Sequence, residues 1–230
     1  MLAIIPARKN SVGLKKKNIK KFHSKELIRL TLELAKKIKV IDKILVSSDD
    51  KKILEISKEL EVDFILERPK YLSGPNISAV NVYLHALKHV QKNSDYKPNE
   101  FIILQPTSPL RTAKSINESY KLYKSKKALS VISCVKSRYP EEWKFELSKR
   151  EKIIKRNFSS LQINRQNFEK SYYPNGSIYI INTLFFTKYK TYYSNKSYGY
   201  RMNKIESIDI DDIYDFKLAE AAFCLKKLKI

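Results

Sequence analysis

Short apolar segments alternate with amphipathic segments from the first residues to Val135, and this alternation constrains the fold more than any other feature. The apolar runs expected to form strands are residues 2–6, 43–47, 62–66, 101–104 and 129–135. The helices expected from apolar residues at three- and four-residue spacing are 24–39, with Ser24 as the cap, 51–60, 77–90 and 113–123. Strands that alternate with helices indicate βαβ units. We therefore expect an α/β fold with a mainly parallel sheet.

The alternation stops after Val135. Residues from about 136 to 174 are charged, aromatic and irregular, which indicates an insertion such as a subdomain or a dimerisation arm. Strands are expected again at 176–181 and 205–208, and an apolar-periodic helix ends the chain. The apolar fraction of 43% is enough for a buried core. We expect one domain over residues 1–230 with an inserted arm.

The sequence has no feature of a membrane or exported protein. Its longest apolar runs are far shorter than the roughly 20 residues of a membrane span, and the N-terminus lacks the arrangement of a signal peptide. Cys134 and Cys224 are far apart and lack the spacing of metal ligands. We expect a cytoplasmic protein with two reduced thiols and no membrane partner.

The formal net charge of +22 raises the possibility of a basic nucleic-acid-binding protein. Most of this charge is lysine spread over the whole length, and the chain is also rich in Ile, Asn, Ser and Tyr. This pattern indicates a compositional drift rather than a binding stripe. We expect no nucleic-acid partner, although a few of the cations should serve an anionic substrate.

The loop after the first strand is the first candidate site. Arg8 leaves the strand directly, the turn-forming run 10–13 follows, and Lys15, Lys16 and Lys17 come next. Backbone amides and cations at the carboxyl end of a parallel strand are suited to phosphates. The loop is therefore a candidate triphosphate site, and the alternative for any one lysine is an ordinary solvated side chain.

A pair of carboxylates forms the second candidate site. Asp209 and Asp211 follow the expected strand 205–208, and alternate residues of an extended backbone point to the same side. Two carboxylates beside a triphosphate are typical of Mg²⁺, which takes few protein ligands and several substrate oxygens. The alternative is that Asp211 or Asp212 caps the final helix, which would leave Asp209 unexplained.

Two further segments carry polar groups near strand ends. The loop Gln105-Pro-Thr-Ser-Pro-Leu-Arg111 follows a buried strand, and its two prolines fix the backbone. The second segment holds Arg165 and, before another strand, an Asn-Gly turn signal followed by Tyr179. These residues are suited to a sugar pocket, and structural roles fit them equally well.

The motifs together resemble a known family. The segments PAR-x-x-S-x-G-x-x-x-KN, VSSDD, ERP, LQPTSPLR, RQ…PNGSIYI and SIDID occur in the order seen in the acylneuraminate cytidylyltransferases, the CMP-sialic acid synthetases. The resemblance covers essentially the full length. Enzymes that activate legionaminate and pseudaminate are similar, and the enzyme for 3-deoxy-manno-octulosonate is a more distant relative.

The resemblance implies a fold and an activity. The fold is a three-layer, Rossmann-like nucleotide-diphospho-sugar transferase fold with a mainly parallel mixed sheet and an inserted dimerisation arm. The activity is transfer of CMP from CTP to the anomeric hydroxyl of a nonulosonic 2-keto sugar acid, with pyrophosphate release, for surface glycan biosynthesis. Mg²⁺ is the implied cofactor and a homodimer the implied assembly.

The resemblance and the loop patterns together define a predicted site. The predicted catalytic residues are Arg8, Lys17 and Asp211, and the metal ligands are Asp209 and Asp211. The predicted nucleotide-binding residues are Arg8, Asn10, Ser11, Gly13, Lys17, Asn18, Arg68 and Ser78. The predicted sugar-binding residues are Gln105, Arg111, Arg165, Tyr179, Tyr192 and Tyr193, of which the last two replace an aromatic pair that the family contributes from the partner subunit.

Three departures from the family pattern limit these expectations. Val12 stands where family members usually have Lys, and residues 75–79 replace a base-reading Asp-Thr-Ala-Ser-Ser, leaving only the Ser78 hydroxyl. A lysine that approaches the sugar in the family aligns only loosely near Lys144. A homologue that binds nucleotide without turnover is therefore a further alternative.

Overall fold

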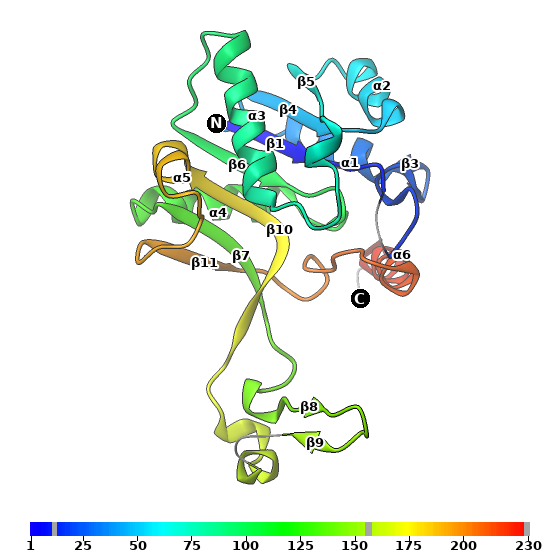
Figure 1. Ribbon diagram of the computed structural model, residues 1–230, viewed down its shortest axis with the longest axis vertical. Coiled ribbons are helices and arrows are strands. Elements are labelled where there is room, and N and C mark those ends of the chain that lie inside the picture. The colour runs from blue at the N-terminus through cyan, green and yellow to red at the C-terminus, as the bar shows by residue number, and fades with distance from the viewer. Residues whose placement is uncertain (11–12, 155–157, 228–230) are drawn as a thin grey trace.

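A computed structural model describes residues 1–10, 13–154 and 158–227 of the chain (Figure 1). The strands are β1 (Leu2–Pro6), β2 (Lys21–Phe22), β3 (Lys25–Glu26), β4 (Lys43–Ser48), β5 (Phe64–Glu67), β6 (Glu100–Leu104), β7 (Ser130–Lys136), β8 (Glu146–Leu147), β9 (Ile153–Ile154), β10 (Tyr172–Asn182) and β11 (Ser197–Arg201). The α-helices are α1 (Leu27–Lys36), α2 (Lys51–Glu59), α3 (Ala79–Asn93), α4 (Ala113–Ser125), α5 (Thr183–Tyr189) and α6 (Ile213–Lys227).

A seven-stranded sheet in the order β11-β7-β10-β6-β1-β4-β5 forms the centre of the fold. β1 pairs in parallel with β4 and β6, β4 with β5, and β7 with β11. β10 runs antiparallel to both of its neighbours, β6 and β7. The expected mainly parallel, mixed sheet is therefore confirmed.

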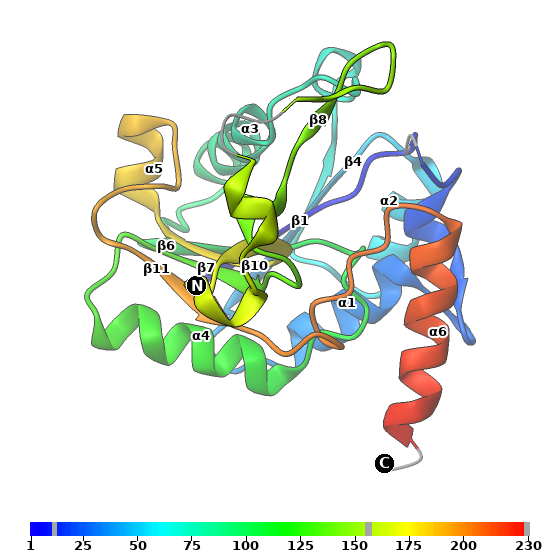
Figure 2. The same cartoon turned by 90° about the horizontal axis from the view of Figure 1, so that it is seen from below.

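Helices cover both faces of the sheet (Figure 2). Ala3 and Ile5 of β1 pack with α1, α2 and α4, whereas Leu2 and Ile4 pack with α3 and α5. Because successive residues of a strand face opposite sides, a strand buried on both faces is apolar at every position, as β1 is. The expected three layers are confirmed, and α6 packs on a separate apolar cluster that includes Phe22 and Ile210.

Two local expectations are wrong. The first helix does not begin after Ser24, because His23, with a φ of 55°, turns the chain into a β2–β3 hairpin that includes Lys25 and Glu26. Residues 205–208 do not form a strand. Asn203 accepts hydrogen bonds there from the backbone amide of Glu206 (2.9 Å) and the hydroxyl of Ser207 (2.7 Å), and these bonds fold the segment into a turn. β11, which the sequence pattern did not reveal, supplies the additional strand.

The described residues of 137–171, here called the arm, leave the sheet between β7 and β10 and project from the body of the molecule (Figure 1). Strands β7 and β10 continue together to the base of the arm, where Lys136 lies opposite Tyr172. Beyond this ribbon the arm contains the short β8–β9 hairpin and several turns of 3₁₀-helix. Its exposed large apolar side chains include Phe145, Leu147, Ile153, Ile154 and Phe158.

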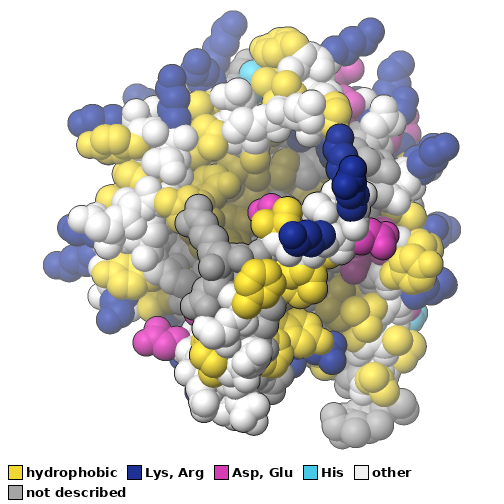
Figure 3. Space-filling model, turned by 60° about the horizontal axis from the view of Figure 1, so that its bottom comes forward, with side chains coloured by type: hydrophobic (Ala, Val, Ile, Leu, Met, Phe, Trp, Pro, Cys, Tyr) yellow, Lys and Arg dark blue, Asp and Glu magenta, His cyan; other side chains and the backbone are white. Residues whose placement is uncertain are grey.

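Lysine and arginine side chains surround the face shown in Figure 3 and do not form one stripe across it. This distribution agrees with the even spread of lysine along the sequence. Within residues 1–10, 13–154 and 158–227, no helix is long and apolar enough to cross a membrane.

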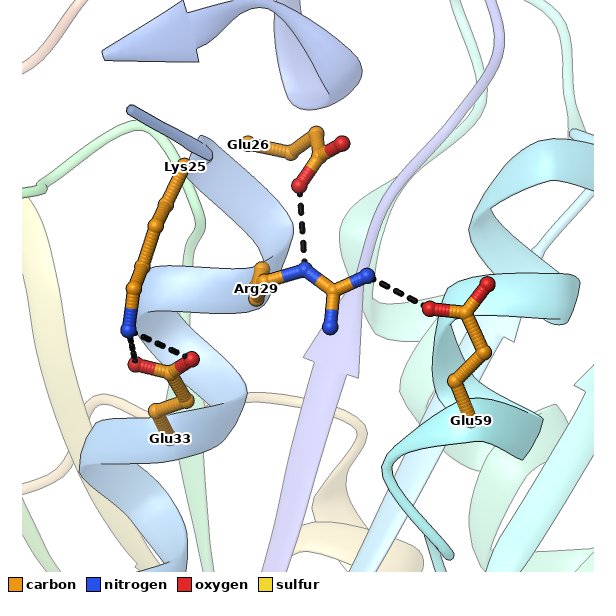
Figure 4. Close-up of polar contacts among 5 residues, drawn as sticks. All are labelled: Lys25, Glu26, Arg29, Glu33 and Glu59. Atoms are coloured by element: carbon orange, nitrogen blue, oxygen red, sulfur yellow. Dashed lines mark hydrogen bonds and ion pairs between the residues drawn. The ribbon is translucent and has the colours of Figure 1, made fainter. Parts of the chain in front are cut away.

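A polar network joins β3, α1 and α2 on the surface (Figure 4). Arg29 of α1 donates from Nε to Glu26 (3.0 Å) and from Nη2 to Glu59 of α2 (2.6 Å). Lys25 forms a third ion pair, with Glu33 one turn further along α1 (2.6 Å). The network ties α1 to α2 and to β3.

Candidate active site

The candidate site lies where the carboxyl ends of β1 and β6 meet the segment 207–212. β1 and β6 are adjacent parallel strands, so the loops that follow them leave the same edge of the sheet. The backbone amide of Ile210 donates to the carbonyl of Thr107 (2.8 Å), which fixes the segment 207–212 against the loop after β6. Three segments far apart in the sequence therefore meet at this edge.

The loop after β1 is tied down by hydrogen bonds along its described part. The amide of Lys9 donates to Asp49 Oδ1 (2.7 Å), and Asn18 Nδ2 donates to the carbonyl of Arg8 (3.0 Å). Arg8 Nη1 reaches the carbonyl of Gly74 (3.4 Å). These bonds hold the Arg8 backbone, and Arg8 is one of the residues that line the groove described below. Ser11, one of the predicted nucleotide-binding residues, lies outside the described residues, as does Val12.

The lysine run divides into exposed and buried members. Lys15 and Lys16 are exposed, whereas Lys17 and Asn18 are 8% and 6% exposed. Lys17 Nζ forms an ion pair with Asp211 Oδ1 at 3.0 Å. Of the three lysines, the structure therefore selects Lys17 for the site, and the solvated alternative fits the other two.

Gly13, in the opening loop, lies against the backbone of the acidic segment. A Cβ atom at Gly13 would lie 2.4 Å from the backbone carbonyl oxygen of Asp211, so no side chain fits there. Glycine at this position lets residues some 200 positions apart approach backbone to backbone. The loop after β1 and the acidic segment therefore touch directly.

Asp209 lies deeper than Asp211. Its Oδ1 is buried and has no hydrogen-bond partner among the described residues. Burial raises the pKa of Asp209 and the Asp211 carboxylate adds to the rise, while the nearby Thr107 hydroxyl and the Lys17 ammonium oppose it. Gly176, with a φ of 74°, lets the chain pass close by, since a Cβ there would lie 3.1 Å from Asp209 Oδ2 and 3.4 Å from Gln105 Oε1. Gln105 and Asp209 are thus neighbours.

These residues line two neighbouring pockets, which are here called the two halves of one groove. The first half, of about 530 Å³, includes Arg8, Gly13, Lys17, Asn18, Gln105, Thr107 and Asp211. The second half, of about 850 Å³, includes Gln105, Lys136, Tyr179, Lys204, Asp209, Asp211, Asp215 and Leu218. Gln105 and Asp211 line both halves, so the two halves join at the acidic segment. We call them the cationic half and the aromatic half.

The acidic pair fits a magnesium ion. Within the part of the chain that the structure describes, no cluster of three or more His, Cys, Asp or Glu side chains could enclose a metal. The orphaned Oδ1 of Asp209 and the exposed carboxylate of Asp211 offer two hard oxygen donors beside a cationic groove. Mg²⁺ is suited to one or two carboxylates with substrate oxygens completing the coordination.

Other predicted nucleotide-binding residues lie outside the described lining of the groove. Arg68 is 6% exposed and donates to Ser47 Oγ (3.1 Å) and to the Ser47 carbonyl (2.7 Å). Burial lowers the pKa of Arg68, and the nearby Asp49 carboxylate opposes the shift. Ser78 caps α3, where its hydroxyl accepts from the amide of Val80 (3.3 Å). Asn10 is exposed at the loop.

Arg111 is a buried brace and does not line the groove. It is 4% exposed and donates to the carbonyls of Gln105 (3.2 Å) and Ser177 (2.6 Å) and to the Thr31 hydroxyl (3.4 Å). Burial lowers its pKa to about 9, and Asp209 opposes this shift. Arg111 therefore fixes the loop after β6 against β10, and its predicted sugar-binding role stays a prediction.

The three predicted aromatic residues, Tyr179, Tyr192 and Tyr193, form a row of ring contacts. Tyr179 lines the aromatic half, and its ring meets that of Tyr192 edge-on at 5.4 Å between centroids. Tyr193 packs against Tyr192 at 5.0 Å and is 53% exposed. Burial raises the pKa of Tyr179, and Tyr192 adds to the rise. The backbone of Arg165 belongs to a 3₁₀ turn of the arm, and its side chain lies outside the described part of the chain.

Sequence reasoning missed two residues of the site. Asp49 belongs to the motif VSSDD, yet its bond to the Lys9 amide depends on the parallel pairing of β1 with β4. Asp215 accepts hydrogen bonds from the amides of Asp211 and Asp212. The spacing Asp212-x-x-Asp215 resembles a capping box and was the available signal for this contact.

The chain is similar to known proteins over nearly its whole length. A family model described as Cytidylyltransferase matches residues 2–229. The chain is 34% identical over 220 residues to an N-acylneuraminate cytidylyltransferase of Escherichia coli O18:K1:H7, covering 95% of this chain and 51% of that protein. It is 29% identical over 222 residues to a CMP-N,N'-diacetyllegionaminic acid synthase of Legionella pneumophila, covering 96% and 94%. The chain thus spans about half the length of the first relative and nearly all of the second.

The fold is also found in solved structures. A CMP:2-keto-3-deoxy-manno-octonic acid synthetase complexed with CTP superposes with a TM-score of 0.70 at 14% identity, covering 98% of each chain. This similarity confirms the expected nucleotide-sugar transferase fold.

Proposed function

The chain belongs to the cytidylyltransferase family, and from that premise we propose that it transfers the cytidylyl group of CTP to a nonulosonic, sialic-type 2-keto sugar acid. The anomeric hydroxyl of the acid is the acceptor and pyrophosphate is the leaving group. The names of the two relatives, one acting on N-acylneuraminate and one on N,N'-diacetyllegionaminic acid, support this substrate class. Legionaminate, pseudaminate and 3-deoxy-manno-octulosonate are the alternative acceptors.

One observation carries the proposal. A cationic loop and an acidic pair share one groove, although such groups usually bind ligands of opposite charge. The 3.0 Å ion pair of Lys17 with Asp211 joins them. Phosphoryl and nucleotidyl transfer depend on positioning and on neutralising phosphate charge rather than on covalent chemistry by the protein. A groove with cations at one end and carboxylates at its middle is suited to that task.

The reaction divides between the two halves of the groove. In the cationic half, Arg8 and Lys17 bind the phosphates, and Gly13 lets the loop that carries them lie against the backbone of Asp211. In the aromatic half, Gln105 and Tyr179 hold the sugar acid with its anomeric hydroxyl toward Asp211. The hydroxyl oxygen bonds to the α-phosphorus while the bond from that phosphorus to the pyrophosphate oxygen breaks. The hydroxyl proton passes to an acidic side chain or to water.

Magnesium is the cofactor we propose, with Asp209 and Asp211 as its ligands. When bound, the ion would neutralise charge on the phosphate oxygens. Neighbouring residues hold the two carboxylates in place. Gly176 and Gln105 lie against Asp209, and Lys17 forms an ion pair with Asp211.

A panel of sugar acids tests the function. We expect pyrophosphate release from CTP and Mg²⁺ only when N-acetylneuraminate, legionaminate, pseudaminate or the octulosonate is added. Asp211→Asn should abolish turnover while leaving the melting temperature within a few degrees of wild type. Absence of release with all four acids would refute the proposal, and CTP binding without release would indicate a homologue that binds nucleotide only.

We also propose that the arm joins two copies of the chain. The hairpin β8–β9 exposes Leu147 (61%) and Ile154 (51%) on a segment that projects from the body (Figure 1). Apolar side chains on a projecting segment are stable in water when a partner covers them. Light scattering should give a dimer for the wild type and a monomer for Leu147→Asp/Ile154→Asp. The same mass for both proteins would contradict this use of the arm.

We place the protein in the cytoplasm, acting in surface glycan biosynthesis.

A further inference from the structure

Asp215, in the first turn of α6, is bonded to the backbone of the acidic segment. Its Oδ2 accepts from the amide of Asp211 (3.0 Å) and from the amide of Asp212 (3.2 Å). In return, Asp212 Oδ1 accepts from the amides of Tyr214 (2.8 Å) and Asp215 (2.9 Å). The two carboxylates form a reciprocal cap at the N-terminus of α6. Only the bond from Asp211 reaches beyond the cap into the site.

Asp211 depends on its backbone for its orientation. Its side chain is 80% exposed, and among the described residues its one ion-pair partner is Lys17. Ile210, by contrast, is fully buried, and Asp209 is largely enclosed. The ion pair with the buried Lys17 is thus the one such contact that holds the exposed carboxylate among the described residues, and the rest of its orientation comes from the backbone.

The Asp211 backbone is held from two directions. Its amide donates to Asp215, and its carbonyl lies against Gly13, where a Cβ would come within 2.4 Å. These contacts fix the peptide units on both sides of the Asp211 Cα atom and hence the direction in which the side chain leaves it. Asp215 itself lines the aromatic half of the groove.

We propose that Asp215 is a positioning residue. By accepting a hydrogen bond from the backbone amide of Asp211, it directs the Asp211 carboxylate toward the metal and the phosphates. This inference rests on the magnesium-dependent function proposed above. The property that matters is the acceptor oxygen and not the negative charge. Asparagine keeps an acceptor oxygen at the same place, whereas alanine removes it, so the two variants separate the two properties.

The test measures CTP binding by calorimetry, once with Mg²⁺ and once with EDTA. The ratio of the two affinities reports the contribution of the metal without any need for turnover. Loss of a group that orients a metal ligand weakens metal binding or activity by about 10- to 100-fold. For Asp215→Ala we expect the ratio to fall by about that factor, while the affinity in EDTA stays within about threefold of wild type. Asp215→Asn should restore most of the ratio.

Asn182→Ala is the matched control. Asn182 caps α5 by accepting from the amide of Phe185 (2.9 Å), and it lies outside the described lining of the groove. Both alanine variants lose a helix cap, at a typical cost of about 1 kcal/mol, so both should melt earlier. Asn182→Ala should leave the metal ratio unchanged.

Three outcomes would overturn the inference. An unchanged ratio in Asp215→Ala would show that Asp211 needs no such support. An equal loss in Asp215→Asn and Asp215→Ala would assign the effect to charge. An equal fall of the affinity ratio in Asn182→Ala would show that the fall results from lower stability and not from the position of Asp211. A wild type whose CTP affinity does not respond to Mg²⁺ would instead refute the proposed magnesium site, which separates the two failures.

Discussion

Gly13→Ala is the substitution that most directly tests how the two parts of the site meet. The new Cβ would lie 2.4 Å from the carbonyl oxygen of Asp211, whereas ordinary contact begins at 3.4 Å. The opening loop and the acidic segment must therefore move apart by about 1 Å, the difference between these distances. The obstacle is backbone, which cannot rotate away as a flexible side chain would. The Gly13 φ is not in the left-handed region, so the effect is steric and not conformational.

The magnitude follows from this displacement. A misplacement of 1 Å at a reacting centre costs about 100-fold in rate. We expect kcat/KM for CTP to fall by about that factor in a coupled pyrophosphate assay with saturating sugar acid. Overpacking typically costs about 1–3 kcal/mol of unfolding free energy. That cost corresponds to a decrease in melting temperature of several degrees for a chain of this length.

Gly199→Ala is the control, because it adds a close contact elsewhere. Its Cβ would lie 3.1 Å from Cys134 Sγ, on β11 and outside the described lining of the groove. It should lower stability modestly and leave kcat/KM within threefold of wild type. If Gly13→Ala also stayed within threefold, the approach of the loop to Asp211 would not control catalysis and our reasoning would fail.

Three further substitutions test separate parts of the structure. Lys17→Met should raise the KM for CTP by about 10- to 100-fold in the pyrophosphate assay, since a charge-assisted hydrogen bond contributes about 1.5–3 kcal/mol; an unchanged KM would remove Lys17 from the phosphate site and leave only its pairing with Asp211. Arg111→Met should lower the unfolding free energy in urea by about 3 kcal/mol, because two carbonyls lose a buried donor; a raised KM for the sugar acid with unchanged stability would favour direct sugar binding instead. Burial tends to raise the pKa of Glu26, but its backbone amide and Arg29 outweigh burial and hold it below 4.5. The stabilising effect is therefore present above pH 4.5 and is lost as the pH falls through the folded-state value. Arg29→Met should cost about 1–2 kcal/mol at pH 7 and clearly less at pH 3, and an equal cost at both would contradict the ion-pair explanation.

The alternation of apolar strands and amphipathic helices was enough to predict the mainly parallel sheet. A strand such as β1, apolar at every position, must be covered on both faces, and only helices between the strands can provide that cover. Local signals failed where a turn changed the direction of the chain. The left-handed His23 turned the expected helix start into a hairpin, and the turn at Asn203 replaced an expected strand.

The candidate site shows the same division. The sequence by itself determined the chemistry available: Arg8 and the lysine run after one strand, two carboxylates near the end of the chain, and the polar loop after Gln105. The tertiary structure decided which of these groups act together. It buried Lys17 against Asp211, left Lys15 and Lys16 in solvent, and turned Arg111 into a brace.

The physical reason is that the types and spacing of residues fix what each segment offers, whereas burial and distance depend on how segments pack. Lys15 and Lys17 have the same side chain and are two positions apart, and only the fold decides which of them is buried away from solvent. Asp215 depends on the fold in the same way. Its spacing from Asp212 is compatible with a helix cap and says nothing of the site. Its role at the site arises because it accepts a hydrogen bond from the amide of Asp211, whose carbonyl lies against Gly13 near the other end of the chain.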